Sequence, residues 1–354
     1  MNHAHRMESL SGAIESPLLV SKAPNLRYLT GFTGSSGWML VRPGGSATFM
    51  TDGRYGEFAA ELVAELPDTD LVVYTSGMWD SFRGIVGGLG SVQLEADDVT
   101  WGFADEFAKE TGVEIGHGNG VVEGLRRTKD SDEIAALQAA ADAGDSAFAA
   151  LDRLIESAAS EEALGWRLID EMRAAGGQAA AWEPIVAAGA GASIPHYRSG
   201  LNPVGSELLL MDYGCTVEGY HSDMTRTVWL VGEPDEQMKR VYRAVAESQV
   251  AGLAAVMPGA TCGSVDEAVR EVLREYDLEE QFIHSTGHGV GLEIHEPPWI
   301  RKGNDDVLMP GDAVTVEPGV YLPGVGGVRI EDMVLVTESG STVLTKSSKE
   351  LTAS

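Results

Sequence analysis

One stretch of the sequence, from Glu207 to Leu230, places two aspartates in otherwise apolar and β-branched surroundings. Its two apolar runs flank a turn-forming segment, which predicts a β-hairpin. If the turn is centred between Val217 and Glu218, then Asp212 and Asp223 face each other across the strands with Cβ atoms about 5 Å apart. Two carboxylates that close repel one another, and a metal ion between them is the simplest way to offset the repulsion.

A second stretch, from residue 314 to residue 336, repeats this arrangement. Glu317 and Glu331 end two β-rich runs around the turn LPGVGG, and Gly324 is the midpoint between them. The same reasoning predicts that these two carboxylates oppose one another across a hairpin. Two hairpins of matching design would therefore supply four carboxylates.

The segment HSTGHGVGLEIHE carries three histidines. His284 and His288 have the spacing of a helical zinc pair, but the glycines on both sides of His288 argue against a helix, and no Glu follows His284. We expect His288 instead to lie where the backbone approaches a compact ligand. Four carboxylates and one imidazole form an oxygen-rich site, which suits two divalent first-row ions and the chemistry of hydrolysis.

Each of these residues also has an ordinary structural explanation. A single Asp or Glu at a strand end is more often a cap, a turn former or half of a surface ion pair, and a single His is usually a satisfied core or surface group. The metal hypothesis depends on the coincidence of four carboxylates in two similar hairpins with a His in a glycine-rich loop.

Composition limits the other possibilities. A chain of 354 residues with 44% apolar content is long enough for two domains, and its net charge of −29 argues against nucleic acid or an anionic membrane as a partner. No apolar run approaches the ~18 residues of a membrane span, so a cytoplasmic location is the default expectation. Cys215 and Cys262 are expected to be free thiols, with Cys215 packed in the core.

The order of predicted elements indicates a smaller α/β domain followed by an α+β domain. Residues 17–120 alternate short strands and helices, including an ion pair and helix cap expected at Asp52 and Arg54. The seam is expected within residues 121–130, where Asp130 and Glu133 form a capping box. The following elements are a helix to residue 155, a helix at 161–175, a strand at 181–189, a loop at 191–200, helices at 235–256 and 264–276, and a β-rich end.

These motifs resemble those of the pita-bread metallopeptidases, the family of methionine aminopeptidase, aminopeptidase P and prolidase. The matching motifs are Asp212, Asp223 in DMTRT, His288 in GHG, Glu317 in EPG and Glu331 in RIED. NLRYLTGFTGSSG and TDGRY are similar to the N-terminal domain of the aminopeptidase P and prolidase branch. The resemblance implies a creatinase-like α/β domain at residues 1–125 and a pita-bread catalytic domain at residues 126–354.

The resemblance also implies an activity: hydrolysis of the Xaa-Pro bond in dipeptides or at the N-terminus of short peptides, by a homodimer with two divalent ions, Mn before Co, Zn or Fe. The implied metal ligands are Asp212, Asp223, His288, Glu317 and Glu331. The implied substrate contacts are His196, His284, His295 and Arg329. Glu317 would also shuttle protons, and His196 and His295 would stabilise the oxyanion-like intermediate. By position, Arg329 is expected to orient ligand carboxylates, and Thr225 to orient Asp223.

Two alternatives stay open at this point. The chain could be a pita-bread protein that binds a partner without catalysis, although such proteins usually lose ligands and this sequence retains all five. It could also be an aminopeptidase of the same fold without specificity for proline, because proline selection is implied only by the resemblance.

Overall fold

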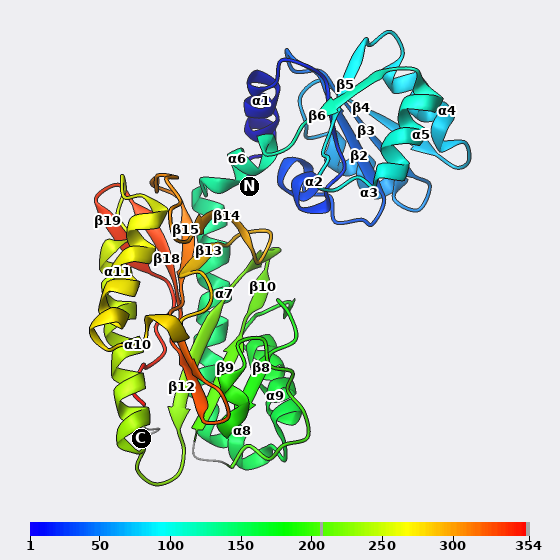
Figure 1. Ribbon diagram of the computed structural model, residues 1–354. Helices are drawn as coiled ribbons and strands as arrows, with labels where there is room; N and C mark the ends of the chain where they lie inside the picture. The colour runs from blue at the N-terminus through cyan, green and yellow to red at the C-terminus, as the bar shows by residue number, and fades with distance from the viewer. Residues whose placement is uncertain (206–207, 352–354) are drawn as a thin grey trace. The chain divides into compact units, whose positions relative to one another are not determined.

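The computed structural model describes residues 1–205 and 208–351, so Glu207, where we expected the first hairpin to begin, lies outside the described residues. The chain divides into two compact units, Met1–Arg126 and Arg127–Ser354 (Figure 1). Each unit is described by itself.

The first unit contains a six-stranded sheet in the order β4-β3-β2-β1-β5-β6. Its strands are β1 (Leu18–Val20), β2 (Gly37–Val41), β3 (Ala47–Asp52), β4 (Thr69–Tyr74), β5 (Ser91–Leu94) and β6 (Glu114–His117). Its helices are α1 (His3–Ala13), α2 (Ala23–Thr30), α3 (Gly56–Val63), α4 (Met78–Val86), α5 (Trp101–Thr111) and α6 (Val121–Arg127). The predicted alternation of strands and helices is thus confirmed.

Two details of this unit differ from the prediction. Helix α1 was not expected, because only a few of its residues, such as Met7 and Leu10, are apolar and buried. The ion pair between Arg54 and Asp52 is present at 2.7 Å, but Asp52 does not cap α3, whose N-cap residue is Tyr55. Asp52 instead accepts a hydrogen bond from the backbone N–H of Arg54, which tightens the turn before the helix.

The second unit is built from four small sheets between helices. The helices are α7 (Ser131–Ala149), α8 (Leu151–Ser157), α9 (Glu161–Ala174), α10 (Glu236–Ala255) and α11 (Cys262–Glu275), with short 3₁₀ helices η1 (Gly189–Ser193) and η2 (Glu279–Gln281). The strands are β7 (Ala179–Ala180), β8 (Ile185–Ala188), β9 (Leu208–Tyr213), β10 (Cys215–Val217), β11 (Tyr220–His221), β12 (Met224–Trp229), β13 (Gly287–Gly289), β14 (Glu296–Ile300), β15 (Ala313–Val316), β16 (Gly319–Leu322), β17 (Gly326–Arg329), β18 (Asp332–Thr337) and β19 (Gly340–Val343).

Strand β9 shows how this unit is layered. Leu208 and Leu210 pack into a cluster with α10 and α11, whereas Leu209 and Met211 pack into a second cluster with α7, α8 and α9. Because side chains alternate along a strand, β9 is covered by helices on both faces, which agrees with its continuous apolar run (Figure 1). The same alternation turns Asp212 towards the face of Leu208 and Leu210.

Helix α7 begins as predicted and ends earlier than predicted. The Asp130 side chain accepts from the backbone N–H of Glu133, whose carboxylate accepts from the Asp130 N–H at 2.8 Å, which confirms the capping box. The helix breaks at Ala150 and restarts as α8, instead of running through to residue 155. The strand expected at residues 181–189 is likewise shorter, since β8 spans Ile185–Ala188.

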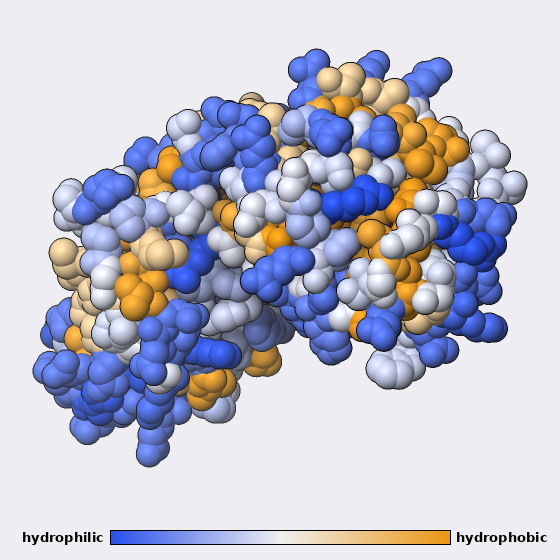
Figure 2. Space-filling view, turned by 90° about the horizontal axis from the view of Figure 1, so that it is seen from above, coloured by the Kyte–Doolittle hydropathy of each residue, from blue (hydrophilic) through white to orange (hydrophobic). Residues whose placement is uncertain are grey.

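The surface carries both hydrophilic and apolar residues. Figure 2 shows a face on which hydrophilic residues predominate and apolar residues form separate patches. No helix in the described part of the chain is long and apolar enough to cross a membrane. Both cysteines are buried free thiols, and Cys215 packs into the cluster beneath α7 and α9, as expected.

Candidate metal centre

The first hairpin forms with a register that differs from the predicted one. Thr225 is the cross-strand partner of Asp212, so Asp223 lies two residues further along and is a diagonal neighbour. The cause is the turn, in which Glu218 and Gly219 both have positive φ angles of 48° and 79°, as a two-residue hairpin turn requires. Side chains two residues apart on a strand point to the same face, so Asp223 lies on the same face of the hairpin as Thr225 and its partner Asp212. Both aspartates therefore still line one cavity.

The second hairpin forms in the predicted register. Val316 pairs with Asp332 in β15 and β18, and Gly319 pairs with Arg329 in β16 and β17. Both pairs are centred on Gly324, whose φ of 74° suits the turn, so the pairing places Glu317 opposite Glu331. The prediction for this pair is confirmed.

The Nε2 atom of His288 faces these carboxylates. It lies in β13, as the glycines indicated, and its Nδ1 contacts the carbonyl oxygen of Gly289 at 3.0 Å. Nδ1 must therefore carry the proton, and the neutral ring presents Nε2 as an acceptor. Nε2 lies 3.6 Å from Asp223 Oδ2 and 3.4 Å from Glu317 Oε1. Three atoms that can each offer a lone pair to a metal ion thus converge.

Asp212 adds a further acceptor atom. Its Oδ2 accepts from Arg329 at 2.5 Å, while its Oδ1 is buried without a hydrogen-bond partner. A buried, unpaired carboxylate oxygen is costly unless a cation or donor meets it. Ligand atoms of Asp223, His288 and Glu331 also lie within 4.8 Å of one another, as a metal site requires.

The pKa values show the electrostatic cost of this cluster. Burial is the largest cause of a raised pKa in all four carboxyls, and it outweighs Arg329 at Asp212. Repulsion from Glu331 adds to burial at Asp223 and Glu317, whose pKa values lie well above the usual range. Glu331 is raised to a pKa of about 7. Burial lowers the pKa of His288 to about 4, so its ring is neutral at pH 7 and able to bind a metal.

Thr225 and Arg329 hold the carboxylates in place. The Thr225 hydroxyl donates to Glu331 Oε2 at 2.6 Å, so it orients Glu331 and not Asp223, contrary to our expectation. Arg329 donates through Nε to Thr225 and through a terminal nitrogen to Asp212. With its side chain only 5% exposed, the Arg329 guanidinium is positioned to orient ligands, as predicted from its place in the strand.

Tyr321 was not predicted, although it lies in the same hairpin. Its hydroxyl oxygen accepts from Arg329 at 2.8 Å, and the hydroxyl is 2.9 Å from His284 Nε2. His284 Nδ1 faces the Ser285 carbonyl, so Nε2 is the acceptor and Tyr321 donates to it. Burial lowers the pKa of His284 to about 4, which keeps this ring neutral. Alternation from Glu317 could have indicated Tyr321, because i and i+4 share a strand face.

All nine predicted site residues line or adjoin one cavity of about 370 Å³. Its lining residues include Asp212, Asp223, Glu317, Glu331, Arg329, His196, His284, His288, His295, Trp182 and Trp299. The His295 ring packs edge-on against His288 with centroids 4.4 Å apart, and His196 is exposed. A cavity of about 470 Å³ beside α7 contains none of these residues.

Glu161 is a second residue that the sequence did not reveal. This fully buried carboxylate accepts from the Ala188 N–H, the Tyr197 hydroxyl and the Gly200 N–H. It thereby fixes the loop that carries His196. The sequence does not indicate this role, because an acidic residue in the first turn of a helix is common for electrostatic reasons alone.

The chemistry of this donor set fits divalent metal ions. Carboxylate oxygens and one neutral imidazole face a common point, one buried oxygen has no other partner, and the raised pKa values would fall on cation binding.

Comparison with known proteins also indicates a metallopeptidase. The model of "Metallopeptidase family M24" matches residues 135–338, and that of the "Creatinase/Prolidase N-terminal domain" matches residues 14–128. The chain is 37% identical over 340 residues to the peptidase YqhT of Bacillus subtilis, with 94% of each chain covered. It is 32% identical over 336 residues to a Xaa-Pro dipeptidase of Pyrococcus horikoshii, covering 94% of this chain and 93% of the relative.

Solved structures agree. A Xaa-Pro dipeptidase from Bacillus anthracis matches with a TM-score of 0.93 at 35% identity over 99% of both chains. An X-Pro aminopeptidase from Thermotoga maritima matches with a TM-score of 0.87 at 30% identity, over 98% of this chain and 100% of that one. The expected pita-bread catalytic domain with a creatinase-like N-terminal domain is confirmed, and the chain belongs to metallopeptidase family M24.

Proposed function

We propose that this protein is a dimetal peptidase that hydrolyses the Xaa-Pro bond in dipeptides or at the N-terminus of short peptides. The observation that carries the proposal is the convergence of His288 Nε2 with oxygens of Asp223 and Glu317, at 3.6 and 3.4 Å. The relatives named Xaa-Pro dipeptidase and X-Pro aminopeptidase support the substrate class.

Five residues would hold two divalent ions: Asp212, Asp223, His288, Glu317 and Glu331. Mn is the first candidate among Mn, Co, Zn and Fe, because the set is rich in oxygen. When bound, the ions supply Lewis-acid activation of water and of the scissile carbonyl. In this proposal residues 1–125 form the N-terminal domain and residues 126–354 the catalytic domain, and homodimer assembly and a cytoplasmic location stay predictions.

Glu317 moves the proton in this mechanism. Its carboxylate takes a proton from the attacking water and passes it to the leaving proline nitrogen. Burial and repulsion from Glu331 raise the pKa of Glu317 well above its usual range, which is the direction that a proton carrier requires. The hydroxyl of Thr315 lies 3.4 Å from Glu317 Oε1 and donates to it, which keeps that oxygen oriented.

His196 and His295 would donate to the scissile carbonyl oxygen as negative charge develops on it. Both line the cavity near Asp212, and both contribute to the electrostatic environment of its carboxyl. The His284 ring is kept neutral by burial and is held in place by the Tyr321 hydroxyl. Its Nδ1 lies 4.0 Å from Glu317, so His284 would contact the substrate on that side of the cavity. Trp182 and Trp299 supply apolar walls against which a proline ring could pack.

A panel of peptides tests this function. With saturating Mn²⁺, we expect hydrolysis of a Xaa-Pro dipeptide or a Xaa-Pro tripeptide to exceed that of the matching Xaa-Ala peptide by at least about 10-fold in kcat/KM. Turnover of the dipeptide would identify a dipeptidase, and turnover of the tripeptide alone an aminopeptidase. Equal rates for Xaa-Ala would refute proline specificity, and metal binding without any turnover would favour the non-catalytic alternative.

A further inference from the structure

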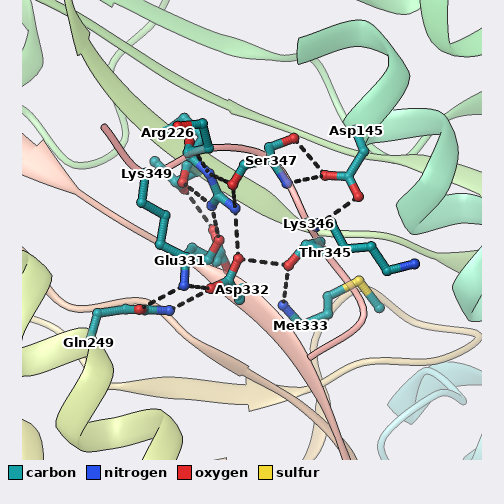
Figure 3. Close-up of polar contacts among 12 residues, drawn as sticks. Asp145, Arg226, Gln249, Glu331, Asp332, Met333, Thr345, Lys346, Ser347 and Lys349 are labelled. Carbon is teal, nitrogen blue, oxygen red and sulfur yellow. Dashed lines mark hydrogen bonds and ion pairs between the residues drawn. The ribbon is translucent and has the colours of Figure 1, made fainter. Parts of the chain in front are cut away.

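A buried ion pair lies directly behind the metal centre. Arg226 and Asp332 are 1% and 0% exposed, and an Arg226 terminal nitrogen donates to Asp332 Oδ1 at 2.7 Å (Figure 3). Each residue follows a residue of the centre in the sequence, since Arg226 comes after Thr225 and Asp332 after Glu331. The ion pair therefore joins β12 to β18 directly beside Thr225 and Glu331.

The pair fixes the backbone of Glu331. Arg226 donates to the Glu331 carbonyl oxygen at 2.5 Å and to the Thr225 carbonyl oxygen at 2.9 Å. The Glu331 N–H in turn donates to the Thr225 carbonyl at 3.1 Å. Both polar groups of the Glu331 backbone are thus held, so its carboxylate can move only by side-chain rotation, which the Thr225 hydroxyl also restricts.

The segment Thr345–Lys349 completes this arrangement from the other side. The Lys349 ammonium contacts Asp332 Oδ2 and donates to Gln249 at 3.0 Å, and the Thr345 hydroxyl donates to Asp332 Oδ1 at 2.8 Å. Arg226 also donates to the carbonyls of Ser347 and Ser348. Figure 3 shows these side chains pointing toward Asp332 from three separate parts of the chain.

The charges explain why Lys349 matters to the pair. Asp332 is a fully buried carboxylate whose two oxygens face two cations, Arg226 at Oδ1 and Lys349 at Oδ2. If Lys349 is removed, Asp332 Oδ2 keeps only the neutral donor Gln249 at 2.7 Å. Removing one partner leaves a buried charge undercompensated. We expect Asp332 then to draw Arg226 closer, and Arg226 is the residue that donates to the Glu331 carbonyl.

The segment is itself firmly anchored. Asp145 in α7 accepts from the backbone N–H groups of Lys346 and Ser347, both at 2.8 Å. Further along, the Tyr242 hydroxyl donates to the Lys349 carbonyl, and the Leu351 carbonyl accepts from the Trp229 N–H in β12. These contacts fix the backbone on both sides of Lys349, whose ammonium contacts Asp332.

We propose that Lys349 is a positioning residue of the metal centre, which acts through Asp332 and Arg226 on the carboxylate of Glu331. The inference rests on the proposed metal-binding function and extends it to the segment Thr345–Lys349. Its consequence is that metal affinity depends on a lysine that is not itself a ligand.

The test compares Lys349→Met with Lys346→Met, a matched control in the same segment. The Lys346 side chain is 66% exposed, and its ammonium lies 3.6 Å from Asp142. Both changes remove one positive charge, which alone would strengthen cation binding. We expect Mn²⁺ titration calorimetry of the stripped full-length protein to show about 10-fold weaker binding for Lys349→Met and no loss for Lys346→Met.

Two more variants separate positioning from folding. Lys349→Arg should restore most of the affinity, because it keeps the charge. Thr345→Val removes the hydroxyl that donates to Asp332 at 2.8 Å and accepts from the Met333 N–H at 3.3 Å, leaves the Lys349 contact with Asp332 in place, and should weaken Mn²⁺ binding several-fold in a protein that still unfolds cooperatively. A positioning role predicts that kcat/KM at saturating Mn²⁺ falls far less than metal affinity.

Wild-type Mn²⁺ affinity in folded Lys349→Met and Thr345→Val would overturn the inference and leave the proposed function standing. Equal losses in Lys349→Met and Lys346→Met would also overturn it. A wild-type protein that binds no divalent metal would overturn both.

Discussion

Asp223→Asn is expected to lower kcat/KM for a Xaa-Pro dipeptide by more than about 10³-fold, which corresponds to at least about 4 kcal/mol of lost transition-state stabilisation. Asp223 is 5% exposed and one of the three residues with ligand atoms within 4.8 Å of one another. Asparagine has almost the same shape but no charge, so it preserves packing and removes an anionic ligand. Steady-state kinetics over a range of Mn²⁺ concentrations measures the effect.

The same change should stabilise the metal-free protein. Asp223 carries a pKa well above its usual range because of burial and repulsion from Glu331, so a neutral side chain relieves an unfavourable interaction. We expect a higher metal-free melting temperature together with lost activity. Glu338→Gln, an equivalent change at an exposed residue just beyond β18, should alter neither property. An Asp223→Asn enzyme with wild-type activity would exclude Asp223 as a ligand.

In the metal-free protein, the stabilisation contributed by Glu331 is expected to fall as the pH rises from 6.5 to 8.5. The pKa of Glu331 is raised from 4.5 to about 7, so the folded state holds its proton more tightly, and this stabilisation is lost as pH rises through 7. Glu331 contributes a loss of about 1 kcal/mol over this window. The lowered pKa values of His284 and His288 have the opposite sign: each imidazole is half protonated at pH 6.5 in the unfolded chain and adds about 0.4 kcal/mol of stability as the pH rises to 8.5. The opposing contributions are separated by comparing the wild type with Glu331→Gln.

Denaturant unfolding with a chelator, repeated at several pH values, measures this slope. With saturating Mn²⁺ the stability should rise with pH, because metal binding requires ionised carboxylates and so strengthens with pH. In the metal-free state, Glu331→Gln should lose about 1 kcal/mol less stability than the wild type across the window. Equal pH profiles for the two metal-free proteins would contradict the described electrostatics of Glu331.

Much of this site could be predicted from local sequence. The turn glycine at 324 sets the register of the second hairpin, so equal spacing from that glycine correctly placed Glu317 opposite Glu331. The glycines around His288 excluded a helix and allowed the close approach of strands β13, β14 and β15. Strand alternation put Arg329 on the face of the carboxylates, where it donates to Asp212.

The errors and omissions arise from contacts between distant segments or from turn geometry. Spacing alone did not distinguish a turn centred before Glu218 from one centred after it, and the left-handed pair at Glu218 and Gly219 decided the register. The partner of Thr225 is Glu331, which is 106 residues away. The hydrogen bonds of Glu161 to the loop that carries His196, and the contact of Lys349 with Asp332, each join distant segments of the chain. No local sequence pattern indicates such contacts.

Titration of chelator-stripped protein with Mn²⁺, followed by the rate of Xaa-Pro dipeptide or tripeptide hydrolysis, tests the central claim most directly. The account predicts no hydrolysis without metal and a rate that reaches its maximum when two ions are bound per chain. Hydrolysis that survives complete stripping, or no hydrolysis with Mn²⁺, Co²⁺, Zn²⁺ or Fe²⁺, would contradict it.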